Sequence, residues 1–307
     1  MPENNEPQFE SFSFTQSAPI KIKAFVNDSI EGLFVLDNGS STCTLDSAFF
    51  YDNFDTSQYK IWKKHRSLWF EYGIGDIKFS IGDHVFSTQH SFTIKNLHEQ
   101  GRAGIIGIEA FQDKVTVINF DENRIAFLDS FTIPSDYHKI RLYSPHPDTM
   151  KYLKHSKYIE VSGFKDIKNE ELTGQFLFDL GSSGGGLSST HKFFKKIQKD
   201  TSKITMGYSK LVQSQSKFNN QTYYMDSLYF DSQIKLCDVP IAIKFHPNDR
   251  AYDPLDQLKY GDGLLGLKIL SQFNLIYDAP NDLLYVKPNK NYFEKSNRDS
   301  ILSRQKL

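Results

Sequence analysis

The sequence predicts a mainly β protein built from two homologous, barrel-like lobes with a cleft between them. Short apolar runs rich in Phe, Tyr, Ile and Val, which are typical of strands, recur along the chain. Helical periodicity is confined to short segments. A motif of Asp, Gly and Ser after an apolar run occurs twice. With 307 residues, each half is long enough to bury its own hydrophobic core.

The internal repeat is visible in two pairs of matched segments. Phe34–Ser41 reads FVLDNGSS in the first half, and Phe176–Ser183 reads FLFDLGSS in the second. Further along, Gly104–Ile108 reads GIIGI and Gly263–Leu267 reads GLLGL. Because self-similarity of this kind is the mark of a repeated structural unit, we expect both halves to have the same fold.

Hairpins and further strands follow from alternating apolar residues and turn residues. Each half is predicted to end in a hairpin, Val115–Phe120 with Ile125–Leu128 and Phe273–Tyr277 with Leu283–Val286. Other predicted strands are Ile20–Val26, Ile77–Ile81, His84–Phe92, Tyr223–Phe230 and Val239–Phe245.

Two short helices are predicted at matching places, about nine residues after each motif aspartate. The first covers Asp46–Phe54 and is capped by Asp46. The second covers Thr190–Lys199 and is capped by Ser188 or Ser189, with three apolar residues on one face. These helices extend the repeat beyond the motifs themselves.

The prolines in Ser130–Met150 give this segment the composition of a linker between the lobes. We therefore predict four regions. These are an N-terminal extension at 1–17, a first lobe at 18–132, a second lobe at 133–290 and a charged tail at 291–307.

Composition limits the partners that we expect. Lys and Arg number 36 and Asp and Glu number 37, so the net charge of −1 favours neither nucleic acid nor an anionic membrane surface. No apolar run is long enough for a membrane span. The first fifteen residues have no signal-peptide pattern, so we expect no export signal in this chain, and the compartment stays open. We expect a monomer.

Cysteine and histidine usage indicates no special chemistry. Cys43 and Cys237 lie in different halves, which favours two free thiols, although one bridge between the lobes stays possible. The nine histidines show no metal-ligand spacing, so we expect no metal and no other cofactor.

A strand that delivers Asp-x-Gly-Ser into a tight loop, followed later by two apolar residues and Gly, resembles the signature of the aspartic peptidases. Two copies in one chain resemble the bilobal pepsin-like arrangement, with lobes similar to retropepsin-like bacterial members, over residues 18–290. The resemblance implies the acid protease fold and an Asp37 and Asp179 dyad that activates water. It also implies a peptide or unfolded protein as the substrate.

The residues around the two acids fit such a dyad. Gly39 and Gly181 allow a sharp turn where a Cβ atom could obstruct the opposing loop. Ser40 and Ser182 are expected to donate hydrogen bonds to the carboxylates. Two carboxyls about 3 Å apart cannot both ionise, so one proton is shared.

The resemblance also implies a hairpin flap over the cleft. The candidate is Tyr72, Gly73, Ile74 and Gly75, where the two glycines would permit a mobile tip and Tyr72 could bond near the substrate. An ordinary exposed hairpin is the alternative interpretation of the same residues.

Asn38 and Leu180 depart from the family pattern, in which a hydroxyl residue between Asp and Gly bonds across to the opposite loop. Asn38 keeps donors and an acceptor for a modified cross-bond, whereas Leu180 has none. Two functions therefore stay open. One is an aspartic endopeptidase, and the other is a catalytically weak or inactive relative that binds peptides in the same cleft.

Overall fold

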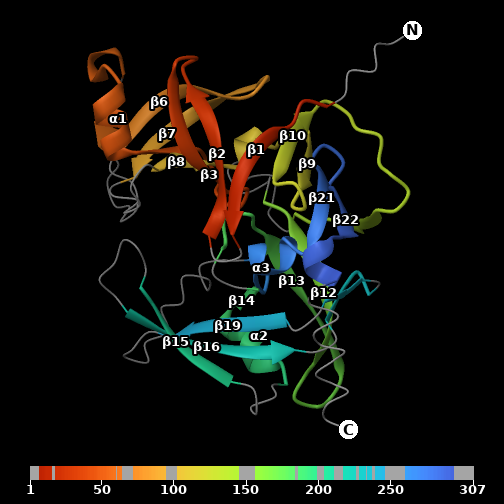
Figure 1. Cartoon of the computed structure of the whole chain (residues 1–307). Helices are drawn as coiled ribbons and strands as arrows, with labels where there is room; N and C mark the ends of the chain where they lie inside the picture. Colours follow the sequence, from red (N-terminus) through yellow and green to blue (C-terminus); the bar gives the residue numbers. More distant parts are fainter. Residues whose placement is uncertain are drawn as a thin grey trace.

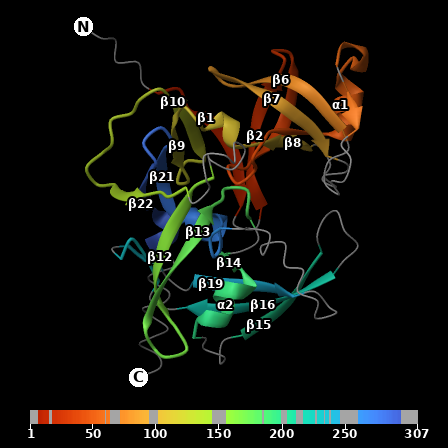
Figure 2. The same ribbon diagram turned by 180° about the vertical axis from the view of Figure 1, so that it is seen from behind.

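The computed structural model describes residues 7–15, 18–59, 61–63, 72–94, 102–144, 156–183, 186–198, 204–210, 217–225, 228–232, 234–236, 239–245 and 260–293. These residues form a mainly β structure with curled sheets (Figures 1 and 2). Among them, no helix has both the length and the apolar composition needed to cross a bilayer.

The first sheet has 13 strands and contains both the start and the end of the described chain. Its strands are β1 (Glu10–Thr15), β2 (Ala18–Val26), β3 (Ile30–Leu36), β4 (Thr44–Asp46), β5 (Trp62–Lys63), β6 (Tyr72–Ile81), β7 (His84–Ile94), β8 (Arg102–Ile106), β9 (Val115–Asn119), β10 (Arg124–Leu128), β11 (His138–Arg141), β21 (Phe273–Asp278) and β22 (Leu283–Pro288). An additional pairing of β2 with β6 curls this sheet back on itself.

The second sheet has 9 strands from the second half of the chain. They are β12 (Tyr158–Lys165), β13 (Glu171–Phe178), β14 (Leu187–Ser189), β15 (Ile204–Lys210), β16 (Lys217–Met225), β17 (Leu228–Phe230), β18 (Ile234–Leu236), β19 (Val239–Phe245) and β20 (Gly263–Leu265). The helices are α1 (Ser47–Asn53), α2 (His191–Lys196) and α3 (Leu267–Leu270), with 3-10 turns η1 (Thr56–Gln58) and η2 (Ile108–Ala110).

The same strand pairings occur in both halves. Strand β3 is parallel to β8, and β13 is parallel to β20. The short strand after each aspartate loop then pairs antiparallel with the strand of the glycine motif, β4 with β8 and β14 with β20. Each short strand also has a parallel neighbour on its other side, β7 or β19. The repeated sequence motifs therefore lie in repeated hydrogen-bonded surroundings.

The two terminal hairpins, β9–β10 and β21–β22, were both predicted from the sequence and pair with each other. Strand β21 lies antiparallel to β9, with Leu275 opposite Ile118, and the four strands lie side by side in both views (Figures 1 and 2). Strand β1, which falls within the predicted N-terminal extension, adds to β10. Strand β11, within the predicted linker, adds to β22.

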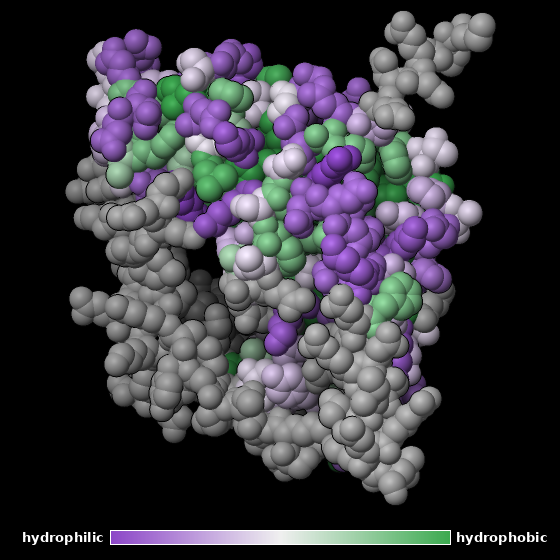
Figure 3. All heavy atoms as spheres, in the orientation of Figure 1, coloured by the Kyte–Doolittle hydropathy of each residue, from purple (hydrophilic) through white to green (hydrophobic). Residues whose placement is uncertain are grey.

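Most of the buried apolar side chains from both sheets form one large cluster, and Val115, Val117 and Ile276 form a second, small one. The largest members of the large cluster are aromatic, such as Phe34 and Phe79 in the first half and Phe164 and Phe176 in the second, all essentially unexposed. The described residues on the face in Figure 3 mix hydrophilic and hydrophobic side chains. Most of the large apolar side chains among the described residues therefore lie in the core.

Local caps explain the helix starts, with one correction. Asp46 caps α1 as predicted, by accepting bonds from the backbone of Ala48 and Phe49. The second helix is shorter than predicted and is capped by Thr190, which accepts from Phe193 N. Ser188 and Ser189 do not cap it, because both lie in strand β14.

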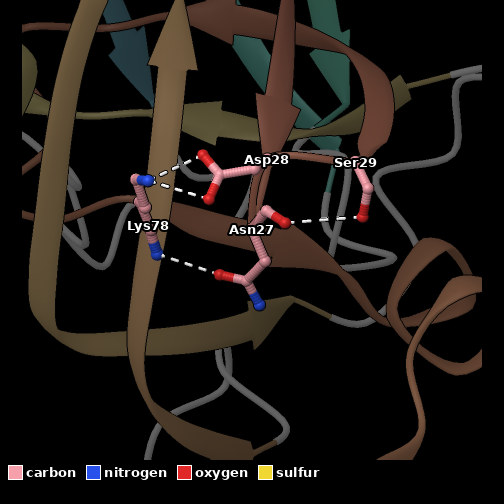
Figure 4. Close-up of polar contacts among 4 residues, drawn as sticks. All are labelled: Asn27, Asp28, Ser29 and Lys78. Carbon is pink, nitrogen blue, oxygen red and sulfur yellow. Dashed lines mark hydrogen bonds and ion pairs between the residues drawn. The ribbon is translucent and has the colours of Figure 1, made fainter.

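The turn between β2 and β3 is fastened to β6 by side chains (Figure 4). Asn27 and Asp28 both have positive φ, 48° and 66°, which short polar residues tolerate. Lys78 donates its backbone N–H to Asn27 Oδ1 at 3.2 Å and pairs through Nζ with Asp28 at 2.7 Å. This fastening supports the β2–β6 pairing that closes the curled sheet.

We predict that Asn274→Ala destabilises the fold. Asn274 is buried on β21, accepts from Phe120 N at 2.9 Å and donates to Asp121 Oδ2 at 2.8 Å, so it ties the two hairpins together. Its loss leaves a buried N–H without a partner, which costs about 1–3 kcal/mol. Urea unfolding measures the change, and the exposed Lys23→Ala variant is the control. Equal effects of both variants would contradict this role.

Candidate active site

Asp37 and Asp179 each come directly after the buried end of a central strand. Asp37 follows β3, and its backbone N–H donates to Ile106 O on β8 at 2.9 Å. Asp179 follows β13, and its N–H donates to Leu265 O on β20 at 3.1 Å. Both aspartates are therefore presented by the same arrangement of parallel strands, one in each half.

Backbone N–H groups orient the first carboxyl. Gly39 N and Ser40 N both donate to Asp37 Oδ1 at 3.0 Å. We expected the Ser40 hydroxyl to donate a hydrogen bond to the carboxyl. Instead, it donates to Thr42 O at 2.9 Å. The turn brings the backbone donors to the carboxyl and leaves the hydroxyl to brace the loop.

The second carboxyl is held in the same way. Gly181 N donates to Asp179 Oδ1 at 2.8 Å, and Ser182 N donates to it at 3.1 Å. In both loops, the backbone of the serine rather than its hydroxyl supplies the recorded bond to the acid.

The structure brings the two carboxyls together. A side-chain hydrogen bond joins Asp37 and Asp179. A Cβ atom on Gly39 would lie 2.7 Å from Asp179 Cγ, and one on Gly181 would lie 2.2 Å from Asp37 Cγ. Each glycine thus makes room for the carboxyl of the opposite loop, as the sequence predicted. Any side chain at either glycine would push the pair apart.

Burial sets the protonation of the pair. Loss of water raises the pKa of Asp179 well above its ordinary value, and the adjacent Asp37 charge raises it further. Burial also raises the pKa of Asp37, but the bond from Asp179, the backbone N–H groups and the positive charge of Arg102 oppose that rise. The pair therefore keeps one proton between the two carboxyls at a pH where a lone aspartate would be fully charged.

Asn38 also links the first loop to the chain on both sides of Asp179. Its Nδ2 donates to Phe178 O at 2.9 Å, and its Oδ1 accepts from Leu180 N at 2.7 Å. The predicted cross-bond through Asn38 is confirmed. Leu180 is fully buried in the apolar core and adds packing instead of a polar link. All polar side-chain atoms of this cross-link thus come from the first loop.

The glycine motifs lie directly behind the aspartate loops. Ile108 N donates to Ser40 O at 2.9 Å, and Leu267 N donates to Ser182 O at 2.8 Å. A Cβ atom on Gly107 would lie 2.6 Å from the backbone of Thr42, so the approach requires glycine. This packing keeps each loop in place relative to its strand.

The candidate flap residues lie in strand β6, not at a hairpin tip as expected. Tyr72 and Gly73 pair with β5 on one side and with β7 on the other, and Ile74 is buried. Gly75 has a φ of 82° where the β6–β7 register shifts, so glycine serves a bulge there. Residues 64–71, which connect β5 to β6, lie outside the described residues.

Two residues near the dyad carried no recognised signal in the sequence. Arg102 begins β8 and favours the charged form of Asp37. Glu109 in η2 accepts bonds from the loop that follows Asp37. An acid within the otherwise apolar segment after the glycine motif was the signal available for Glu109.

Cysteine and metal chemistry add little to the described site. Cys43 is a buried free thiol whose pKa is raised by burial and by the nearby Glu109 charge. Cys237 lies outside the described residues. Within the described part of the chain, no group of three His, Cys, Asp or Glu residues is placed to hold a metal ion. Comparisons with protein-family models and with curated proteins found no match to this chain.

Replacing Asn38 should separate the two loops. Asn38→Ala removes both cross-bonds and leaves Leu180 N and Phe178 O without these partners, so we expect a loss of about 2–4 kcal/mol in the free energy of unfolding. Asn38→Thr should lose less, because one hydroxyl can both donate and accept. Denaturant unfolding of the three proteins checks this order, and equal stability of the Ala and Thr variants would contradict it.

Stability should depend on pH through Asp179. Its raised pKa means that the folded chain holds this proton more tightly than the unfolded chain. That stabilisation is present at low pH and is lost as the pH rises through the raised pKa. Asp179→Asn cannot ionise, and its amide oxygen can still accept the Gly181 and Ser182 bonds.

Measured from about pH 4, near the ordinary pKa of an aspartate, to about pH 8, the free energy of unfolding of Asp179→Asn should therefore exceed that of the wild type by an amount that grows with pH. Urea unfolding at each pH measures the difference. A difference that is constant over this range would show that Asp179 has an ordinary pKa in the folded state.

Proposed function

We propose that this chain is an aspartic endopeptidase with two homologous lobes of the acid protease fold. The observation that carries the proposal is the hydrogen-bonded pair of Asp37 and Asp179, each with its carboxyl against the glycine of the opposite loop. The matched pairings of β3 with β8 and β13 with β20 support the duplication. The substrate class is an extended peptide or unfolded protein.

The protonation of the pair suits hydrolysis. Charged Asp37 takes a proton from water as the water oxygen bonds to the scissile carbonyl carbon, and Asp179 gives its proton to the carbonyl oxygen. The result is a neutral tetrahedral diol. When the C–N bond breaks, Asp37 gives its proton to the leaving nitrogen and Asp179 takes one back from a diol hydroxyl. The pair again holds one proton, and no covalent intermediate with the enzyme forms.

Asn38 gives this chemistry its alignment. Because it bonds both before and after Asp179, at Phe178 O and Leu180 N, it fixes the second loop on each side of the acid. Displacement of a reacting group by about 1 Å can cost roughly 100-fold in rate. One amide side chain therefore replaces polar contacts that Leu180 cannot make.

Cleavage of unstructured peptides tests the proposal. The purified full chain should cleave a fluorogenic peptide library, and Asp37→Asn or Asp179→Asn should each reduce kcat by roughly 10²- to 10⁴-fold. The exposed Asp83→Asn variant is the matched control and should keep full activity. The rate should fall as the pH rises through the raised pKa of Asp179, because the pair then loses its proton.

A peptide-binding protein without catalysis is the second candidate, favoured by the apolar and buried Leu180. Saturable binding of library peptides with no cleavage between about pH 3 and pH 8 would select it. Cleavage that survives in both Asp→Asn variants would show that the activity is not that of the pair.

A further inference from the structure

Glu109 accepts hydrogen bonds from two consecutive residues of the first aspartate loop. Cys43 N donates to its Oε2 at 2.6 Å, and Thr42 Oγ1 donates to its Oε1 at 3.1 Å. Glu109 lies in η2, directly after the glycine motif. A charged acceptor makes such bonds shorter and stronger than neutral pairs do. Its carboxylate thus attaches the far end of the loop to the segment packed behind it.

Further bonds carry this attachment back to Asp37. The Ser40 hydroxyl donates to Thr42 O at 2.9 Å, and Ile108 N donates to Ser40 O at 2.9 Å. Ser40 N in turn donates to Asp37 Oδ1 at 3.0 Å. Ile108 and Glu109 therefore hold the loop on either side of the Ser40–Thr42 bond, and Gly107 N adds a bond to Cys43 Sγ at 3.2 Å. If Thr42 or Cys43 moved, the Ser40 N–H that orients Asp37 Oδ1 would therefore move as well.

The second half has no acid at the matching place. Glu109 is the second residue after Gly107, and the second residue after Gly266 is Lys268, a cation that cannot accept hydrogen bonds. The residue at the matching position therefore cannot attach the second loop as Glu109 attaches the first. Asp37 is also the acid that acts as the base in the proposed mechanism, so the loop that holds the base receives the extra restraint.

We propose that Glu109 is a positioning residue for Asp37, acting through Thr42, Cys43 and Ser40. This inference rests on the proposed function, because positioning matters when the pair does chemistry. Glu109 has no recorded bond to either dyad carboxyl. Its role is to keep the Ser40 N–H directed at Asp37 Oδ1.

Two substitutions separate anchoring from charge. In Glu109→Gln, the amide oxygen can accept from Cys43 N while the amide nitrogen donates to the Thr42 hydroxyl, so both attachments survive. In Glu109→Ala, both are lost. We expect Glu109→Ala to lower kcat by about 10- to 100-fold with KM changed less than about threefold, and Glu109→Gln to keep kcat within about threefold.

Asn274→Ala is the control for stability, because it breaks buried bonds at the hairpins and none in the dyad loops. It should leave kcat per folded molecule unchanged. If Glu109→Ala also left it unchanged, or raised KM alone, the positioning role would be wrong. A loss in Glu109→Gln equal to that in Glu109→Ala would assign the effect to charge and overturn the proposal as well.

A titration that needs no substrate separates this proposal from the proposed function. Carbon-13 NMR of labelled aspartate carboxyls follows the pair in each variant, with Asp179→Asn used for assignment. Loosening the loop in Glu109→Ala should weaken the shared-proton contact, so the upper pKa of the pair falls towards the ordinary range, while Glu109→Gln stays close to the wild type. An unchanged titration in Glu109→Ala overturns the positioning role. If the wild-type chain cleaves no peptide, that result overturns the proposed peptidase function only.

Discussion

Two carboxyl groups packed against each other, with Asp179 buried and Asp37 half-buried, constrain the rest of this site. Charges this close cannot both persist away from water, so the pair must hold a proton between them. That requirement explains the glycines at 39 and 181, where any Cβ atom would meet the opposite carboxyl. Both carboxyls also take their backbone bonds on one oxygen, Oδ1.

The two loops solve the same geometric problem with different side chains. The first loop carries polar attachments, with Asn38 reaching across and Glu109 accepting from behind. The second loop contributes the buried Leu180, which packs into the core. The positive charge of Arg102 also acts on Asp37, where it opposes the rise in pKa that burial causes. The two loops therefore share the same backbone pairing but are attached by different kinds of side chain.

Short-range chemistry was readable from the sequence, and strand pairing outside the repeated motifs was not. Asp46 caps α1 as expected because a cap depends on residues two or three positions away. The cap of α2 was misassigned because three hydroxyl residues, Ser188 to Thr190, stand in a row. The first two belong to β14, which pairs with β19 and β20, so Thr190 is left to cap the helix. Strand pairing likewise moved Tyr72–Gly75 from a hairpin tip into β6.

The site shows the same limit. The duplicated motif was enough to predict which two acids face each other and why glycine follows them. The Ser40 hydroxyl, by contrast, could donate to the acid or to the loop backbone. The turn geometry places it against Thr42 O, to which it donates. Glu109 lies 66 residues from Cys43 in sequence, so no local pattern linked them.

The cost of the pair bears on the choice between catalysis and binding. Burying ionisable groups costs stability unless they are paired and hydrogen-bonded. A cleft that only bound peptides would be more stable with a neutral residue at Asp179, and it would need no N–H donors aimed at both acids. Leu180 is weak support for inactivity, because burial of its side chain contributes about 1.5–3 kcal/mol, at least as much as a neutral cross-bond would. The buried Leu180 thus attaches its loop by packing, and the geometry of the pair depends on Asn38 and the two glycines.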